Sequence, residues 1–229
     1  MTQPNNFGFG EECALLKESA RKWFAERLPT DALHALVAAH PTPEREPQCQ
    51  WDPQLWQEMV ALGWTMLAVP EASGGVGMPL VGVAGLAEEV GRAALPCPLL
   101  PTFNVTYVLA ACGQAGEGAL AEIAEGKSAT LAITDRHGSW SVTETGVSCE
   151  NGRLNGTAWF VQDARKAERL LVSARSDAGL SLYWVAADAP GITITPDRIV
   201  DLTRDQAHIS FQDVTAEEVR LAAGKYFGS

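Results

Sequence analysis

The chain of 229 residues is long enough for one or two domains, and 46% of its residues are hydrophobic, as is usual for a folded globular protein. Its formal net charge of −11 argues against a general nucleic-acid-binding surface or a surface for anionic membranes. The five cysteines are scattered and never form a C-x-x-C pair, which favours reduced thiols over disulfides or a zinc site.

The N-terminal stretch MTQPNNFGFGEE has neither the basic nor the apolar region of a secretory signal. The most apolar stretch, LVGVAGLA, is too short and too interrupted by glycine to span a bilayer. We therefore expect a cytoplasmic protein that has no membrane segment.

The first half of the chain carries apolar residues at helical spacing. One stripe predicts a first helix that ends at Pro29. Its members are Leu16, Ala20, Trp23, Phe24 and Leu28. The Pro-rich residues 41–50 predict a loop. Asp52 followed by Pro53 predicts the N-cap of another helix, and Gly63 is expected to end that helix.

A short apolar segment and a Gly-rich loop lead to the next helix. Residues 80–90 return to helical spacing and are apolar on nearly every side, so we expect this helix to be buried between others. Glu88 and Arg92 have the i,i+4 spacing of an ion pair. Residues 102–111 and 118–125 predict two more helices.

Short strands and turns replace the helical pattern after residue 128. The runs SATLAIT, TAWFV, ERLLVSAR, LSLYWVAA, GITITP and AHISFQDV have the composition of strands, and SWSVTET leads into a further strand. Asn151-Gly152, between VSCE and RLNG, is a strong type I′ hairpin signal. The sequence therefore predicts an α+β fold, with an all-α helical domain at residues 1–127 and an antiparallel β-barrel or sandwich domain at residues 128–229.

No single motif identifies a reaction. The loop SGGVG lacks the full G-x-G-x-x-G spacing, and we interpret it as a plain connection. The histidines have no metal-ligand spacing and no G-x-S-x-G motif is present, so we expect no metal site and assign no nucleophile. Glu88 and Glu89 point to different helix faces, which favours a solvated surface over a catalytic pair. Trp159-Phe160 predicts a strand that is half core and half surface.

Two polar features of the second half allow more than one interpretation. Arg165, Lys166 and Arg169 form a basic cluster, which is more typical of a solvated turn than of a phosphate site. The stretch LAITDRHGSW (residues 131–140) ends a strand in hydrogen-bonding and permissive groups. That end is either an ordinary solvated corner or a set of donors held against an anionic ligand.

Four segments follow one another in a specific order: LWQEMVALGWTMLAVPEASGGVGMPL with AEEVGRA, then LAITDRHGS, then LNGTAWFVQDARKAERLLVSAR, then RDQAHISFQDV. Together they resemble the acyl-CoA dehydrogenase family. The first is similar to its N-terminal helical domain, where a Pro-Glu-x-x-Gly-Gly loop precedes a Glu-Glu-x-Gly-Arg helix. The others are similar to strands of its β domain. The resemblance covers almost the whole chain.

The resemblance implies a flavin site at the strand end. The aromatic and hydroxyl positions that cover the flavin ring and its reactive nitrogen match Phe160 and Gln162 in this sequence. Ser139 would lie near the flavin pyrophosphate and would also contact the bound acyl-CoA. The implied FAD-binding residues are Leu131, Ile133, Thr134, Gly138, Ser139, Phe160 and Gln162.

The resemblance also implies a reaction, the α,β-desaturation of an acyl-CoA thioester with FAD as cofactor. A carboxylate base removes the α-proton while a hydride leaves the β-carbon. Electron-transfer flavoprotein or a similar acceptor is the implied partner, and a homo- or hetero-oligomer is the implied assembly. Family members continue into a C-terminal helical bundle that carries the catalytic Glu. We therefore assign no catalytic residue within these 229 residues and expect no turnover by this chain alone.

The flavin motif departs from the family pattern. Arg136 replaces the proline after Thr-Glu, and the turn to Gly138 is about one residue short. Residues 160–162 read Phe-Val-Gln where Trp-Ile-Thr is usual, and Ala158 stands at the usual Lys position. Two alternatives therefore stay open: a non-catalytic partner subunit of a heteromeric dehydrogenase, or a flavin monooxygenase or acyl-CoA oxidase on the same architecture.

Overall fold

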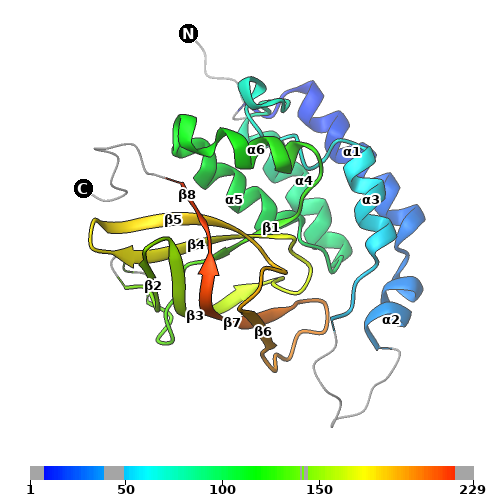
Figure 1. The fold of residues 1–229 in the computed structure, drawn as a ribbon. Coiled ribbons are helices and arrows are strands. Elements are labelled where there is room, and N and C mark those ends of the chain that lie inside the picture. Colours follow the sequence, from blue (N-terminus) through cyan, green and yellow to red (C-terminus); the bar gives the residue numbers. More distant parts are fainter. Residues whose placement is uncertain (1–7, 39–48, 140, 142–143, 220–229) are drawn as a thin grey trace.

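The computed structural model describes residues 8–38, 49–139, 141 and 144–219. Helices form its first half and a sheet forms its second half (Figure 1). The helices are α1 (Glu11–Arg27), α2 (Thr30–Ala38), α3 (Pro53–Ala61), η1 (Glu71–Ser73), α4 (Leu80–Ala93), α5 (Leu99–Ala111), η2 (Gly113–Gly116) and α6 (Glu117–Ala124). The strands are β1 (Ala129–Ala132), β2 (Val147–Glu150), β3 (Arg153–Gln162), β4 (Arg169–Ser176), β5 (Gly179–Ala186), β6 (Ile192–Pro196), β7 (Gln206–Thr215) and β8 (Glu217–Val219). The predicted α-then-β order is confirmed, whereas the division into two domains at residue 127 stays a prediction.

Local signals fix both ends of α3. The Asp52 carboxylate accepts the backbone N–H of Gln54 at 2.8 Å, and Pro53 occupies the first helical position. Gly63 follows the helix with a φ of 75°, a left-handed conformation that costs glycine little. Both helix-end predictions are therefore confirmed.

One helix, α2, has no counterpart in the sequence prediction. It begins at Thr30, directly after Pro29, which the sequence pattern marks only as the end of α1. Proline also suits the start of a helix because its missing N–H needs no partner there, and Pro29 here accepts the N–H of Leu33 at 3.0 Å. Most of the loop predicted at residues 41–50 lies outside the described residues.

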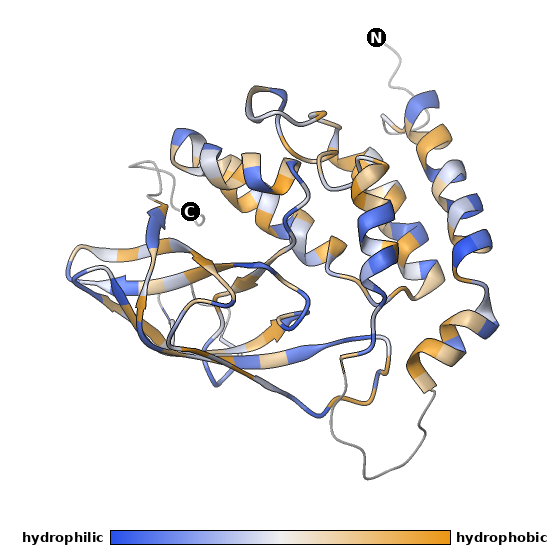
Figure 2. Ribbon diagram, turned by 45° about the vertical axis from the view of Figure 1, so that its right-hand side comes forward, coloured by the Kyte–Doolittle hydropathy of each residue, from blue (hydrophilic) through white to orange (hydrophobic). Residues whose placement is uncertain are grey.

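The helical half has its own hydrophobic core, in which α1 packs against α4. Trp23, Phe24 and Trp64 meet there with ring centroids 5.1 to 5.5 Å apart, in the edge and tilted arrangements that aromatic rings favour. Hydrophobic and hydrophilic residues alternate along α1, the helix beside the N label in Figure 2. The apolar stripe predicted for the first helix is thus the stripe that α1 turns inward.

Glu89 corrects the expectation of a solvated carboxylate pair on α4. Glu88 is exposed and pairs with Lys17 at 2.5 Å and with Arg92 at 3.5 Å, as its i,i+4 spacing predicts. Glu89, however, is only 1% exposed. Its carboxylate accepts hydrogen bonds from Arg92 Nε at 3.0 Å and Arg21 Nε at 3.3 Å. A buried carboxylate requires such partners, so Glu89 ties α4 to α1.

The sheet runs in the order β6-β7-β3-β2-β4-β5-β8, and β1 pairs with β4 outside this path. Most neighbours are antiparallel, as predicted, but β1 and β2 both pair with β4 in the parallel direction. The two end strands β6 and β8 do not pair with each other, so the sheet of the described residues is not closed. The predicted, mostly antiparallel β half is confirmed, and within the described residues it is an open sheet, because no ladder there joins β6 to β8.

The β2–β3 turn confirms the strongest local strand signal. Asn151 and Gly152 have φ values of 51° and 74°, and the flanking residues Glu150 and Arg153 pair across the turn. Positive φ at both central positions is the mark of a type I′ turn, which Asn-Gly adopts readily.

Helices α5 and α6 cover one face of the sheet through a hydrophobic core that they form with β1, β4 and β5. Thr102 of α5 accepts the N–H of Ala129 at 3.0 Å. Glu122 of α6 binds Arg169 Nε at 2.6 Å and Trp184 Nε1 at 3.1 Å. These contacts hold the two halves together. Within the described ranges, no helix is long and apolar enough to cross a bilayer.

Candidate functional site

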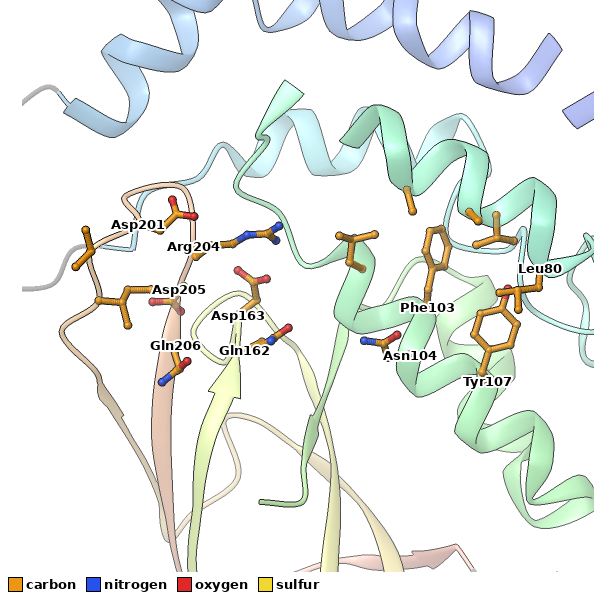
Figure 3. A pocket seen from close by; sticks show the side chains of 16 residues that line it. Leu80, Phe103, Asn104, Tyr107, Gln162, Asp163, Asp201, Arg204, Asp205 and Gln206 are labelled. Carbon is orange, nitrogen blue, oxygen red and sulfur yellow. The ribbon is translucent and has the colours of Figure 1, made fainter. Parts of the chain in front are cut away.

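A cavity of about 720 Å³ lies between the helical half and the sheet (Figure 3). Its volume falls within the range of small-molecule sites, about 300–1,000 Å³. Helices α4 and α5 form one wall, and the end of β3 with the β6–β7 connection forms the other. It is lined by Leu80, Val83, Ala84, Ala87, Leu100, Phe103, Asn104, Tyr107, Gln162, Asp163, Ile199, Val200, Asp201, Arg204, Asp205 and Gln206.

The helical wall of the cavity is mainly apolar, with Asn104 and Tyr107 of α5 as its polar members. Ala84 and Ala87 follow Leu80 along α4 at helical spacing, and Phe103 faces them from α5. Leu80 is 65% exposed, which corrects the expectation that this helix is buried on every side. One face of α4 packs in the helical core, and its other face opens onto the cavity. Small alanine side chains on that face leave room for a ligand.

The opposite wall is polar. Gln162 at the end of β3 and Gln206 at the start of β7 are paired in the sheet, and both line the cavity. Asp201 accepts the hydroxyl of Thr203 at 2.7 Å and its backbone N–H at 2.8 Å. These hydrogen bonds hold the pKa of Asp201 below its usual value, so it remains a carboxylate at neutral pH.

Two ion pairs support this polar wall. Lys166 Nζ lies 2.5 Å from Asp163 Oδ1, and their side chains are 1% and 4% exposed. Arg165 Nε donates to Asp205 Oδ1 at 2.9 Å, and Arg169 binds Glu122 on α6. The expectation of a solvated basic turn at residues 165–169 is therefore wrong. Arg165 and Arg169 each have a carboxylate partner that is distant in sequence, and the partner of Lys166 is the buried Asp163.

Burial raises the pKa of Asp163 and opposes the pull of the Lys166 ammonium. The charges of Asp163 and Lys166 also act on two thiols, the half-buried Cys49 and the buried Cys97. Burial, the largest cause, raises the pKa of Cys49 to about 11 and that of Cys97 to about 12. Neither thiol is a reactive thiolate at neutral pH, so thiol nucleophilic chemistry is not supported beside the cavity.

Of the seven predicted flavin residues, Gln162 is among the residues that line the cavity, and the other six are not. Gln162 lines the cavity, and its backbone carbonyl accepts the Thr130 hydroxyl at 2.6 Å. Leu131 is half-buried and packs against the core between helices and sheet. Ile133, just beyond the end of β1, is 42% exposed. Thr134 continues the sheet by accepting the N–H of Trp159 at 2.9 Å.

Phe160 has an unusual backbone for a residue inside a strand. Its φ is +56°, where the β3–β7 register shifts between Ala158 and Val161. The ring is 44% exposed, and a Cβ added to Gly138 would lie 3.7 Å from it, an ordinary contact. Left-handed conformations at large residues are costly and cluster at functional sites. Ile133 and Phe160 thus present exposed apolar surface at this end of the sheet.

The preceding residue, Trp159, is not among the predicted site residues, but it is held by an ordered polar network. Its ring stacks on His208 with centroids 4.6 Å apart and an interplanar angle of 20°. His208 Nδ1 lies 3.1 Å from the Asp197 carboxylate, which also accepts the Gln206 amide at 3.0 Å. This network joins the β6–β7 connection to the strand that carries Phe160.

The turn after β1 closes on its own aspartate. Asp135 Oδ1 accepts the backbone N–H of Ser139 at 2.9 Å and that of His137 at 3.0 Å. The Ser139 bond, followed by the His137 bond, lowers the pKa of Asp135 below its usual value. Gly138 has a φ of 69°, which lets the turn fold back tightly. Backbone donors that an anionic ligand would need are thus bound to a carboxylate of the chain itself.

Asn104 and Tyr107 of α5 are cavity residues that the sequence prediction omits. They are three residues apart and therefore share a helix face. The signal in the sequence was their polarity within a mainly apolar helix that also contains Thr102 and Thr106, and this signal has no meaning until β3 is placed opposite. In the described segments, no three His, Cys, Asp or Glu side chains gather where a metal ion would bind.

Residues 10–122 match the acyl-CoA dehydrogenase N-terminal domain. The fold of the helices and sheet together also matches that of solved acyl-CoA dehydrogenases, described below. The chain belongs to the acyl-CoA dehydrogenase family. Among curated relatives, it is 31% identical over 170 residues to acyl-CoA dehydrogenase FadE28 of Mycobacterium tuberculosis, which covers 71% of this chain and 49% of the relative. It is 35% identical over 102 residues to acyl-CoA dehydrogenase IpdE2 of Mycolicibacterium smegmatis, covering 42% of the chain and 32% of the relative.

Two solved structures show how far the fold of this acyl-CoA dehydrogenase family member extends. The Tcur3481-Tcur3483 steroid ACAD G363A variant has 30% identity and a TM-score of 0.76, over 93% of this chain and 58% of that chain. The ChsE4-ChsE5 complex from Mycobacterium tuberculosis has a TM-score of 0.73 over 93% of this chain and 57% of that chain, and at 21% identity it supports the fold alone. The matched segments span between 32% and 49% of the length of these two curated relatives.

Proposed function

We propose that this chain supplies the acyl-binding wall and one face of the flavin site of an FAD-dependent acyl-CoA dehydrogenase that desaturates its substrate between the α- and β-carbons. The observation that carries the proposal is the cavity, which places the apolar faces of α4 and α5 opposite Gln162 at the end of β3. An acyl chain needs an apolar wall, and a redox ring needs a polar group at its edge. Both requirements meet in this cavity.

The exposed apolar residues at the end of the sheet would suit the planar ring of a flavin. Ile133 and Phe160 offer apolar surface, and Gly138 leaves space beside the Phe160 ring. Leu131 and Thr134 would position β1 beside the ring, and Gln162 would donate its amide N–H. FAD, when bound, supplies the acceptor for the hydride. In this proposal the residues of the chain orient the acyl group and exclude water.

The similarity to a protein described as a steroid ACAD supports a bulky ring-bearing acyl group as the substrate. An electron-transfer flavoprotein or similar acceptor would reoxidise the cofactor, and the full assembly would be an oligomer. The five free thiols support a cytoplasmic location.

The first test is the visible spectrum of the purified protein after incubation with FAD. The proposal predicts a yellow complex whose flavin fluorescence is quenched, and no acyl-CoA turnover unless the catalytic carboxylate is provided by another polypeptide segment. A colourless protein that raises activity only after co-expression with a second dehydrogenase subunit would contradict flavin binding by this chain. Rapid peroxide release with an acyl-CoA would indicate an oxidase instead.

A second function, that of a non-catalytic partner subunit in a heteromeric dehydrogenase, is favoured by one specific observation. Ser139 is implied to lie near the flavin pyrophosphate, but its backbone N–H already donates to Asp135, as does that of the neighbouring His137. A carboxylate there also repels phosphate. The part of the implied site that would bind phosphate therefore does not fit FAD as well as the ring surface does.

Asp135→Ala separates these two functions. The substitution removes a negative charge and releases two backbone donors, so we expect FAD affinity to rise about three- to tenfold, the value of one or two neutral hydrogen bonds. Flavin fluorescence titration at constant ionic strength measures this change. Asp177→Ala removes the same charge from the β4–β5 turn and is expected to leave the affinity unchanged. A fall in affinity for Asp135→Ala would show that the closed turn is the binding form.

A further inference from the structure

The turn between β2 and β3 carries an Asn-Gly pair that no described residue covers. Asn151 and Gly152 are both exposed and occupy the two central positions of the type I′ turn. Among the described residues, the Asn151 carboxamide has no hydrogen-bond partner and the Gly152 N–H has no acceptor. A Cβ added to Gly152 would meet no atom within 4 Å outside the adjoining residues. The Asn151 side chain and the backbone after it are therefore free to approach each other.

This pair can react with itself. The Gly152 nitrogen loses its proton to solvent and attacks Cγ of Asn151, and the C–N bond that forms closes a succinimide ring. The carboxamide nitrogen takes up a proton and leaves as ammonia, and water then opens the ring at either carbonyl to give aspartate or isoaspartate. Glycine favours ring closure because it has no side chain that crowds the nitrogen. The peptide between the two residues must rotate first, and an exposed turn opens locally at low free energy.

The fold protects a second Asn-Gly pair, Asn155-Gly156 in β3. Asn155 Oδ1 accepts the backbone N–H of Asp213 at 2.9 Å, which holds the carboxamide in place. Gly156 is paired with both β2 and β7, and a Cβ added to it would lie 2.2 Å from the backbone oxygen of Gly146. The same dipeptide thus occurs once in a turn that can open and once in a packed ladder that leaves its peptide no room to rotate.

We propose that Asn151 is a site of spontaneous deamidation and that isoaspartate formed there loosens strand β2. The inference does not depend on the proposed function. An isoaspartyl linkage carries the main chain through Cβ, which lengthens a turn whose flanking residues Glu150 and Arg153 pair with each other. Strand β2 is four residues long and buries Val147 and Cys149 in the core of the sheet. A longer turn weakens the ladder that holds these two side chains.

The test incubates the purified chain at mildly alkaline pH and maps the modified residue by mass spectrometry of tryptic peptides. Trypsin cleaves after Arg153, so the two Asn-Gly pairs fall on different peptides. A mass gain of about 1 Da is expected on the peptide that ends at Arg153. The peptide that begins at Leu154 is expected to gain it at least about tenfold more slowly, because the Asn155 hydrogen bond must break first. Methylation by an isoaspartyl-specific carboxyl methyltransferase distinguishes isoaspartate from aspartate.

The same incubation in urea is the control, since both pairs are then unconstrained and their rates are expected to become similar. Similar rates in the folded chain would overturn the inference, because the fold would then not discriminate between the two pairs. No gain at Asn151 in the folded chain, while the urea sample gains it, would overturn it as well.

Two variants test the effect on β2. Asn151→Gly lacks the carboxamide, and Gly-Gly also adopts type I′ turns, so its melting temperature is expected to be unchanged by incubation. The unmodified chain is expected to melt at a lower temperature after incubation than before. Freshly purified Asn151→Asp adds the charge with an ordinary peptide linkage and is expected to melt like the fresh chain. An incubated chain that contains isoaspartate and melts like the fresh one would contradict the loosening of β2.

Discussion

Asp163→Asn is expected to lower the free energy of unfolding by about 3–5 kcal/mol, the usual cost of leaving a buried charge without its partner. Lys166 is 1% exposed, and its ion-pair partner among the described residues is Asp163, at 2.5 Å. Asparagine retains the left-handed backbone that Asp163 adopts with a φ of 50°. The loss is therefore caused by the uncompensated ammonium, and urea unfolding measures it.

Two variants separate charge burial from backbone effects. The double variant Asp163→Asn/Lys166→Met is expected to recover most of the lost stability, because no unpaired charge remains. Asp213 also has a left-handed backbone, with a φ of 56°, and pairs with Arg153 at the surface. Asp213→Asn is expected to cost at most about 1 kcal/mol. If Asp163→Asn were as mild as Asp213→Asn, Lys166 would have to reach solvent or another carboxylate.

Gly156→Ala is expected to destabilise the sheet by more than about 3 kcal/mol, since it combines backbone strain with a steric clash. Gly156 lies in β3 between β2 and β7, and its φ of 123° suits only glycine. An added Cβ would lie 2.2 Å from the backbone oxygen of Gly146. Either β3 or the backbone at Gly146 must move to relieve this clash. The measurement is urea unfolding, with the yield of folded protein as readout if the variant does not accumulate.

Gly118→Ala makes the same chemical change at a position that has neither a positive φ nor an atom close to the added Cβ. Gly118 lies in α6, and nothing within 4 Å would meet an added Cβ. Alanine favours helix, so stability is expected to stay constant or rise by up to about 1 kcal/mol. A Gly156→Ala protein as stable as the Gly118→Ala protein would contradict the close approach of β3 to Gly146.

Features governed by neighbouring residues were predictable from the sequence. The N-cap at Asp52, the left-handed Gly63 and the Asn151-Gly152 turn depend on local backbone chemistry, and each appears where the pattern placed it. The start of α2 was not predicted, because a proline marks both the end of one helix and the start of the next.

Features governed by distant partners were not predictable. Glu89 looks like a surface carboxylate until α1 brings Arg21 against it, and Lys166 looks like part of a basic turn until its burial is known. The parallel pairing of β1 with β4 joins segments about 40 residues apart, which no local spacing encodes. The sequence likewise contains no sign that Asp135 closes its turn, since that bond depends on the path of the backbone.

The candidate site shows the same division. The family motif drew attention to Gln162, which does line the cavity, whereas Asn104 and Tyr107 lie in a helix whose pattern indicates only packing. The assignment of Leu131, Ile133, Thr134, Gly138, Ser139 and Phe160 to a flavin stays a prediction. Ligand contacts depend on which elements face each other, and that arrangement is a property of the tertiary fold.

Strand β4 pairs with β1 over Arg169–Val172 and with β2 at Arg175. Between them, the Ser173 hydroxyl donates to the Ile133 carbonyl at 3.3 Å, and Thr145 donates to the Ser173 carbonyl at 2.8 Å. Ile133 and Thr145 are thus both hydrogen-bonded to the same residue of β4, Ser173. Ser173 therefore fixes the positions of Ile133 and Thr145 relative to each other, so a shift of β4 at this residue would move both of them together.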